Sequence, residues 1–297
     1  MKTKLSVILP GIRVRNWSKF YQSIINSFND TFELIVVSPF ELPEELKQFD
    51  NIKHIIDYGS PARCQQIGLA NSEGEFVTWG ADDGIFLKNK LTEIFNFWQK
   101  NAKSEKDIVT CKYFEGGANQ QGILHSTGET ELSKDFYYKI NHASGLRSTF
   151  VPDDYWVLNV GLIKTSYAKE LGGWDSIFDV TTIAHMDFAV RTQRNNSTYF
   201  MFEKPVFVCT HMPGVSGDHA PVHFAHTEHD EPLFRRIYNQ PNSVERIKID
   251  INNWKSSSPF WDRRFKRVDT GDIIDVTGHG EYKAPPSQKL TDNKEEQ

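Results

Sequence analysis

Two adjacent carboxylates, Asp82 and Asp83, are the residues whose type and placement first suggest chemistry. They follow the apolar run 75–79, which predicts a buried strand, and Gly84 comes directly after them. Two neighbouring negative charges at a strand end are unfavourable unless water or a cation neutralises them. A divalent metal that bridges to a diphosphate does so, and hard oxygen ligands suit Mg²⁺ or Mn²⁺. The alternative is a surface turn, since Asp-Asp-Gly is common in loops.

The segment 211–231 concentrates a second set of metal-ligating side chains. Half of the ten histidines lie in it, together with several acidic residues. Its first candidate as a metal ligand is His211, which directly follows a predicted strand, and Asp218 and His219 are the next choices. Carboxylates combined with an imidazole favour Mn²⁺ over Mg²⁺. A separate zinc site built from three of these histidines is the alternative.

Predicted strands alternate with helices along the first 111 residues. Segments rich in apolar residues predict strands at 5–9, 33–37, 52–56, 75–79 and 107–111. Helices are predicted at about 16–28, with Asn16 as N-cap, at 60–71 and at 91–98. This alternation predicts βαβ units and a mostly parallel sheet covered on both faces. Ligands of such sheets bind at the carboxyl ends of the strands, where Asp57 and the Asp82–Asp83 pair lie.

Beyond residue 111 the pattern is weaker. The region 112–155 is polar, order returns at 156–160, and strands are predicted near 199–202 and 206–209. Helices are predicted at 185–194 and 231–238, whereas Gly217 and Pro221 predict a loop before the second one. We expect an α/β fold with a Rossmann-like central sheet and a less regular C-terminal extension. The expected division is a domain at 1–235, with halves 1–111 and 112–235, an extension at 236–275 and a disordered tail at 276–297.

Charge and cysteine content exclude several classes of protein. The net charge of −5 argues against non-specific binding to nucleic acid. The cysteines, Cys64, Cys111 and Cys209, are far apart and odd in number, which argues against a disulfide framework and fits a reducing cytoplasm. The apolar run 5–9 is too short for a signal peptide or a membrane span. We therefore expect a cytoplasmic protein with no integral membrane segment.

Four stretches, in matching order, resemble family 2 glycosyltransferases. The longest is 59–83, which follows the family pattern A-R-N-x-G-x-x-x-A-x-G-E-[YF]-[IV]-x-x-x-D-x-D-D at several positions. The matching residues there are Ala62-Arg63, Gly68, Gly74-Glu75-Phe76-Val77 and Ala81-Asp82-Asp83. The other stretches are Ser6 to Pro10, similar to the opening strand; Gly172-Gly173-Trp174-Asp175, similar to the G-G-[FW]-D turn; and Asp187-Phe188 with Arg191, similar to part of the catalytic helix.

The resemblance implies a GT-A fold, a nucleotide-diphosphate sugar as donor and a divalent metal, Mn²⁺ or Mg²⁺. It gives Asp82 and Asp83 the role of contacting the ribose and the metal–diphosphate. It sets Arg63 near the nucleotide, where a guanidinium can pair with phosphate. We expect Asp57 near the base or ribose and Pro10 at the same site. In many GT-A enzymes a histidine from a C-terminal segment completes the metal shell, which is the role expected of the 211–219 residues.

Three departures from the family pattern affect the expected site. Ser38-Pro39-Phe40 stands where the family has an Asp-Asp-Gly-Ser turn, and Gly80 stands where the first Asp of DxD is found. Ala184-His185 replaces a Glu-Asp pair whose Asp is the general base of inverting members. We expect His185 to act as base instead, because imidazole titrates near working pH. Asp187 is the second choice, and an acceptor contact or a plain helix residue is the other role open to His185.

The function that we expect is metal-dependent transfer of a sugar from a nucleotide-diphosphate donor, UDP first, to a hydroxyl of a glycan or another acceptor. Two other functions stay open. A sugar nucleotidyltransferase would need a basic N-terminal loop, of which the stretch from Pro10 to Arg15 is a faint version. A carbohydrate-binding relative without activity is the other, because the Glu-Asp pair of the family is missing.

Overall fold

The N-terminal half of the sheet is parallel. The computed structural model describes residues 2–116, 136–140, 155–156, 158–210, 220–240, 242 and 245–256. Four strands lie in the order β3–β2–β1–β4, all parallel to their neighbours. They are β1 (Leu5–Pro10), β2 (Phe32–Ser38), β3 (Ile52–Ile56) and β4 (Phe76–Trp79). Each agrees with its prediction to within one residue at either end.

The sheet continues beyond β4 with strands of mixed direction, in the order β8–β6–β9–β5, and β7 pairs with β6. Only the β6–β9 pair is parallel among the described strands of this half. The parallel sheet predicted from the sequence is therefore formed by the first four strands. The other strands, most of them antiparallel to their neighbours, complete the α/β sheet. The bounds are β5 (Gly84–Phe86), β6 (Ile108–Gly116), β7 (Phe136–Ile140), β8 (Gly161–Lys164) and β9 (Tyr199–Thr210).

One sequence prediction in this half was wrong. The strands expected at 199–202 and 206–209 are one strand, β9. Its register against β6 shifts, because Phe202 pairs with Cys111 and Pro205 pairs with the next residue, Lys112. Glu203 and Lys204 are accommodated as an irregularity within the strand. The ordered segment expected at 156–160 precedes β8, which begins at Gly161.

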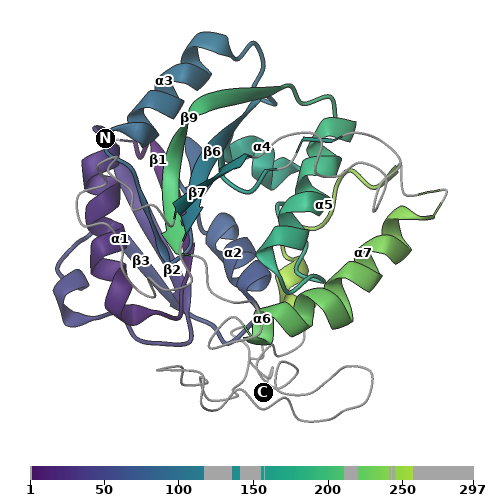
Figure 1. The fold of residues 1–297 in the computed structure, drawn as a ribbon, viewed down its shortest axis with the longest axis horizontal. Helices are drawn as coiled ribbons and strands as arrows, with labels where there is room; N and C mark the ends of the chain where they lie inside the picture. The colour runs from purple at the N-terminus through teal and green to yellow at the C-terminus, as the bar shows by residue number, and fades with distance from the viewer. Residues whose placement is uncertain are drawn as a thin grey trace.

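Helices cover both faces of the sheet, as Figure 1 shows. Leu5, Val7 and Leu9 of β1 pack in one core with α1 (Val14–Ser27) and α3 (Lys90–Asn101). Ile8 faces the other core, which is built with α2 (Pro61–Ala70), α4 (Thr165–Glu170) and α5 (Thr181–Arg194). Successive residues of a strand point to opposite faces, so an unbroken apolar strand must be covered twice. This explains why the runs of the sequence do not alternate.

Gly68 allows α2 to approach β1 closely. A Cβ atom at this position would lie 2.4 Å from Cγ2 of Ile8. We expect Gly68→Ala to destabilise the fold by about 1–3 kcal/mol, because the added methyl overpacks the core. Urea unfolding of Gly68→Ala should show this loss, and the same substitution should cost less in an Ile8→Ala background, which lacks both γ carbons. An equal cost in the two backgrounds would contradict the assigned contact.

The C-terminal part of the described chain is a broken helix followed by an extended return. The helix consists of α6 (Ala220–Ala225), a π-helical turn (His226–Asp230) and α7 (Glu231–Tyr238). The prediction of a helix at 231–238 is confirmed by α7. The prediction of a loop at Pro221 was wrong, because Pro221 lies in the first turn of α6, where proline fits without losing a hydrogen bond. Figure 1 shows α7 beside α5.

The segment 245–256 returns over α2 and α5. Gln66 of α2 donates from Nε2 to the carbonyl oxygen of Ile251 at 2.9 Å. Short 3₁₀ turns lie at Glu44–Leu46 and Asn253–Ser256. Among the described residues, no helix combines the length and the apolar character that a membrane crossing needs. The predicted tail at 276–297 lies outside the described residues, and the domain boundaries stay predictions.

Candidate active site

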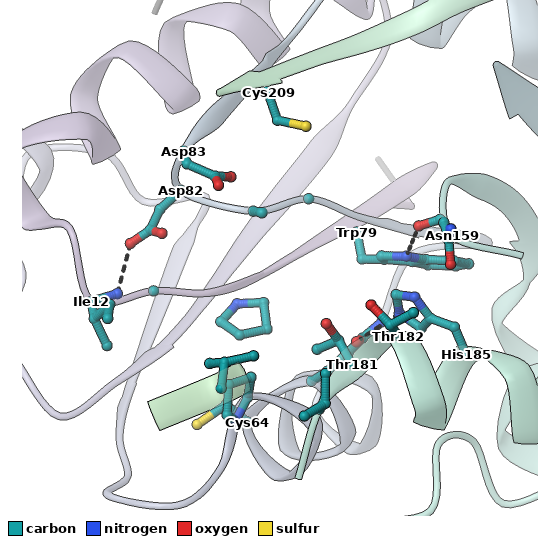
Figure 2. Close-up of a pocket in the computed structure, with 18 of the residues that line it drawn as sticks. Ile12, Cys64, Trp79, Asp82, Asp83, Asn159, Thr181, Thr182, His185 and Cys209 are labelled. Atoms are coloured by element: carbon teal, nitrogen blue, oxygen red, sulfur yellow. Dashed lines mark hydrogen bonds between the residues drawn. The ribbon is translucent and has the colours of Figure 1, made fainter. Parts of the chain in front are cut away.

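A cavity of about 730 Å³ opens at the carboxyl ends of β1 and β4. This is the edge at which α/β sheets bind ligands, and the volume is within the range of ligand sites. Figure 2 shows Asp82 and Asp83 on one side of the cavity and Trp79, Thr182 and His185 on the other. Its walls come from the end of β1, the β4–β5 turn, the first turns of α2 and α5, β9 and the broken helix. The predicted site residues in its lining are Pro10, Asp82, Asp83 and His185.

Asp82 is engaged by the chain that follows β1. Its Oδ2 accepts from the backbone N–H of Ile12 at 2.6 Å and also from that of Arg13. Its Oδ1 lies 2.6 Å from Nη1 of Arg13, and Asn16 donates to its backbone carbonyl. Asp82 is only 2 % exposed. The cation that neutralises this carboxylate is therefore Arg13, and the predicted metal or ribose contact of Asp82 stays a prediction.

This arrangement also explains a wrong prediction about α1. Asn16 was expected as the N-cap, but α1 begins at Val14 and no side chain caps it locally. The Asp82 carboxylate, from a distant turn, accepts from the amides of Ile12 and Arg13 just before the helix. A negative group at a helix N-terminus is favourable because of the exposed N–H groups there.

Asp83 lies on the cavity wall and points away from Asp82. It is partly buried, and Figure 2 places its carboxylate on the side of Cys209 at the end of β9. The two neighbouring acids therefore do different things: Asp82 fixes the β1–α1 connection, and Asp83 faces the cavity. Asp83 is the described member of the predicted metal set that lines the cavity, because His211, Asp218 and His219 lie outside the described residues.

Asp57 and Arg63 pair with each other behind the cavity wall. Nε of Arg63 lies 2.9 Å from Oδ1 of Asp57 and Nη2 lies 3.0 Å from Oδ2, and both side chains are completely buried. The guanidinium also lies 5.0 Å from the ring centre of Trp254. Neither residue lines the cavity. This pair joins β3, α2 and the C-terminal return, and the nucleotide contacts expected of Asp57 and Arg63 stay predictions.

His185 lines the cavity but is enclosed by aromatic rings. Its ring centre is 5.3 Å from that of Trp79 and 6.0 Å from that of Trp174, and its Nε2 is 2.9 Å from Oε1 of Gln65. Burial lowers the pKa of His185 to about 3. The imidazole is therefore neutral near pH 7 and accepts a proton only with difficulty. This weakens its expected role as general base, although its place on the wall allows an acceptor contact.

The buried imidazole makes stability depend on pH. In the unfolded chain a histidine with the ordinary pKa of 6.5 takes up a proton as the pH falls, and folded His185 does not until about pH 3. Folding stability from this group is thus complete above pH 6.5 and is lost below it, by about 2 kcal/mol between pH 7 and pH 5. We expect His185→Gln, which cannot titrate, to reduce the difference between urea unfolding free energies at these two pH values by that amount. An unchanged difference would contradict the buried state of His185.

Asp187, the second choice for a base, faces away from the cavity. Its Oδ2 is 2.7 Å from Nε of Arg191, and its Oδ1 accepts from Tyr238 at 2.7 Å and from Arg246 at 3.1 Å. Burial by itself would raise the pKa of Asp187, but the two guanidiniums outweigh burial and hold the pKa below its ordinary value. Asp187 is completely buried and absent from the lining. This carboxylate joins α5 to α7 and the C-terminal return, and the catalytic role of Asp187 stays a prediction.

The histidines of the broken helix divide between two sides. His223 and His226 line the cavity, as does Glu231. His229 faces α5 instead, with Nδ1 2.6 Å from Asp230 and 3.3 Å from Asp179. These three side chains have ligand atoms within 4.8 Å of one another, a spacing that a metal could use. The backbone amides of Asp179 and Val180 donate hydrogen bonds to Asp230. These bonds attach the broken helix to the start of α5, which explains the cluster without a metal.

Sequence reasoning missed the parts of the site that depend on distant contacts. Arg13 was noted only as part of a faint basic loop, yet it lines the cavity and pairs with Asp82. Thr181 and Thr182, in the first turn of α5, also line the cavity, and Glu231 does so from α7. The family pattern offered no signal for them. The histidine content of 211–231 was the signal that drew attention to the broken helix.

Comparisons with known proteins add evidence on the fold. No known family profile matches the chain. An uncharacterized glycosyltransferase from Rickettsia bellii (strain RML369-C) is 28% identical over 106 residues, which cover 33% of this chain and 15% of that protein. Residues 1–349 of S. aureus TarS, a family 2 glycosyltransferase, match with a TM-score of 0.50 and 15% identity over 88% of this chain and 80% of the other. The chain has a glycosyltransferase fold.

The resemblance to glycosyltransferases predicted from the sequence is confirmed by these comparisons, and so is the α/β fold that it implied. The chain spans only 15% of the length of the R. bellii protein that it matches. TarS has also been solved with UDP, at a TM-score of 0.49 and 16% identity over 89% of this chain and 79% of that one.

Proposed function

We propose that this protein transfers a sugar from a nucleotide-diphosphate donor, with UDP as the nucleotide, to a hydroxyl group of a glycan or another acceptor. The observation that carries the proposal is the cavity of about 730 Å³ at the carboxyl ends of β1 and β4, with Asp83 on its wall, in a glycosyltransferase fold. A crevice of this size at this edge accommodates a nucleotide sugar.

The cavity offers suitable groups for the two ends of such a donor. Asp83 supplies a hard carboxylate oxygen, and Mg²⁺ and Mn²⁺ are commonly held by one or two carboxylates together with substrate phosphates. The described residues thus fit a divalent ion at Asp83, with His211, Asp218 and His219 proposed to complete the site. When bound, the ion supplies charge neutralisation to the departing diphosphate. Trp79, Thr181 and Thr182 form the far side of the cavity, which we assign to the sugar and the acceptor.

The test is a screen for binding and turnover. Ligands that bind only the folded state raise the melting temperature, so UDP with Mn²⁺ should stabilise the protein more than UDP or Mn²⁺ alone. UDP-glucose, UDP-galactose and UDP-GlcNAc are then incubated with the protein and Mn²⁺, and UDP release is measured. Release of UDP from at least one donor supports the proposal. Pyrophosphate release from UTP and a sugar phosphate would favour a nucleotidyltransferase instead, and binding of sugars without UDP release would favour a carbohydrate-binding protein.

A further inference from the structure

The π-helical turn between α6 and α7 brings two polar side chains to one wall of the cavity. In a regular α-helix, residues five apart point about 140° away from each other. Here the wider turn at His226–Asp230 leaves Nε2 of His226 3.7 Å from Oε2 of Glu231, and both residues line the cavity. Single π-helical turns within α-helices are rare and are frequent at functional sites.

The other side of the same turn fixes this helix against α5. Asp230 is completely buried, and its Oδ2 accepts from the backbone N–H groups of Asp179 at 2.9 Å and Val180 at 2.6 Å. His229 lies against the same carboxylate. The turn therefore points His229 and Asp230 toward α5 and leaves His226 and Glu231 on the cavity. A proton acceptor on this helix has a fixed position relative to α5, as a catalytic group requires.

The remaining acids and bases of the predicted site are poorly suited to take a proton from an acceptor. His185 is enclosed between Trp79 and Trp174, and Asp187 is absent from the cavity. Asp82 is bound by the Ile12–Arg13 amides and the Arg13 guanidinium. In contrast, the side chains of His226 and Glu231 are 35% and 29% exposed, so substrate can reach them.

Glu231 is oriented so that it can support a neighbouring imidazole. Its Oε1 accepts from Nη2 of Arg235 at 2.7 Å, one helical turn away. Its Oε2 is the oxygen directed at His226. The 3.7 Å separation is an ion-pair distance, so the carboxylate stabilises the imidazolium that forms on proton transfer. Because Nε2 faces this carboxylate, Nδ1 is the nitrogen left to accept a proton from the acceptor.

We propose that His226 is the general base that deprotonates the acceptor hydroxyl, and that Glu231 is its positioning residue. This inference rests on the proposed glycosyltransferase function. The hydroxyl proton passes to Nδ1 of His226 while the acceptor oxygen forms a bond to the anomeric carbon. The bond from that carbon to the diphosphate oxygen breaks, and its electron pair leaves with the nucleoside diphosphate. Glu231 stabilises the positive charge that His226 acquires.

The first experiment compares wild-type protein with His226→Gln. Each is incubated with Mn²⁺ and the one of UDP-glucose, UDP-galactose or UDP-GlcNAc from which wild type releases UDP fastest. We expect kcat to fall about 10²–10⁴-fold, the usual contribution of a general base. Affinity for UDP with Mn²⁺, measured by calorimetry, should be unchanged. Arg236→Gln, on the exposed side of the same helix, is the matched control and should retain wild-type kcat.

Azide ion distinguishes loss of the base from general damage to the site. Azide attacks the anomeric carbon without having to lose a proton, so it forms a glycosyl azide and releases UDP even when no base is present. We expect azide to restore UDP release in His226→Gln by a far larger factor than it changes the wild-type rate. A variant that is merely misfolded gains nothing from azide, and circular dichroism with the melting temperature checks its fold directly.

Glu231→Gln tests the positioning role through the split between kcat and KM. Removing the carboxylate removes support for the imidazolium that forms on proton transfer, so kcat should fall while KM for the donor stays near the wild-type value. Glu231→Asp should recover part of the wild-type kcat.

Three results would overturn the inference. One is a His226→Gln protein that is folded, binds UDP with Mn²⁺ and keeps the wild-type kcat. Another is a folded variant that azide does not rescue. The third is a His226→Gln protein that loses Mn²⁺-dependent UDP affinity, which would make His226 a metal ligand. If wild type releases UDP from none of the three donors, the proposed function itself fails, and the inference fails with it.

Discussion

Replacing Asp83 by alanine is expected to abolish the Mn²⁺-dependent part of UDP binding and to lower kcat at least about 100-fold. Asp82 and Asp83 both line the cavity, but Asp82 is bound to Arg13, so Asp83 is the carboxylate proposed to hold the metal. A metal that neutralises a departing diphosphate contributes several kcal/mol to transition-state stabilisation, and each 1.36 kcal/mol is about a factor of ten in rate. If Asp83 holds the metal as proposed, removing its carboxylate removes much of this contribution.

Calorimetry of UDP binding with and without Mn²⁺ measures the first effect, and UDP release from the preferred donor measures the second. Glu105→Ala, which removes an exposed acid in the turn between α3 and β6, serves as the control for lost negative charge and should behave like wild type. Asp83→Asn keeps the size of the side chain and should show nearly the same loss as Asp83→Ala. If Asp83→Ala bound UDP with the same Mn²⁺ dependence as wild type, the metal would have to be held elsewhere.

The second large effect is expected at the Asp57–Arg63 ion pair. Arg63→Met removes two hydrogen bonds to Asp57, of 2.9 and 3.0 Å, and leaves a completely buried carboxylate without its cation. Removing one partner of a buried pair typically destabilises a protein by about 3–5 kcal/mol. The double variant Asp57→Leu/Arg63→Met should recover a substantial part of this loss, because it removes both charges together.

Urea unfolding at pH 7 measures these differences. Lys47→Met, which breaks an exposed pair with Glu44, is the comparison and should leave stability unchanged, because exposed ion pairs contribute little. The sequence-based alternative is that Arg63 contacts the nucleotide phosphate. In that case Arg63→Met would weaken UDP binding strongly while stability stayed near the wild-type value. The burial of both side chains leads us to expect the opposite result.

Much of the architecture could be predicted from the sequence because it depends on local pattern. Segments rich in apolar residues located β1 to β4 to within one residue, and Ser60-Pro61 located the start of α2, where the Ser60 hydroxyl accepts from the Arg63 amide. The position of Asp82 and Asp83 directly after a buried strand put them at the edge where ligands bind. Family resemblance then supplied the fold and the class of chemistry.

The role of each charged side chain was decided only by the tertiary structure. Arg13 meets Asp82, Arg63 meets Asp57, and Arg246 meets Asp187, in the last case across 59 residues of sequence. A carboxylate is available for metal or substrate only when no cation from another element already neutralises it, and sequence spacing carries no information about such distant partners. The π-helical turn that joins His226 to Glu231 is a further case, because Pro221 predicted a loop.

The amino-acid sequence by itself therefore determined the four parallel strands β1 to β4, most helices, the sheet edge that holds the cavity and the presence there of acidic residues. Packing decided which acids face the cavity and which join elements to one another, and it extended the parallel sheet with antiparallel strands. The physical reason is the range of the forces. Backbone propensity and apolar pattern act between near neighbours in the chain, whereas burial of charge must be balanced by whatever group the fold brings within a few ångströms.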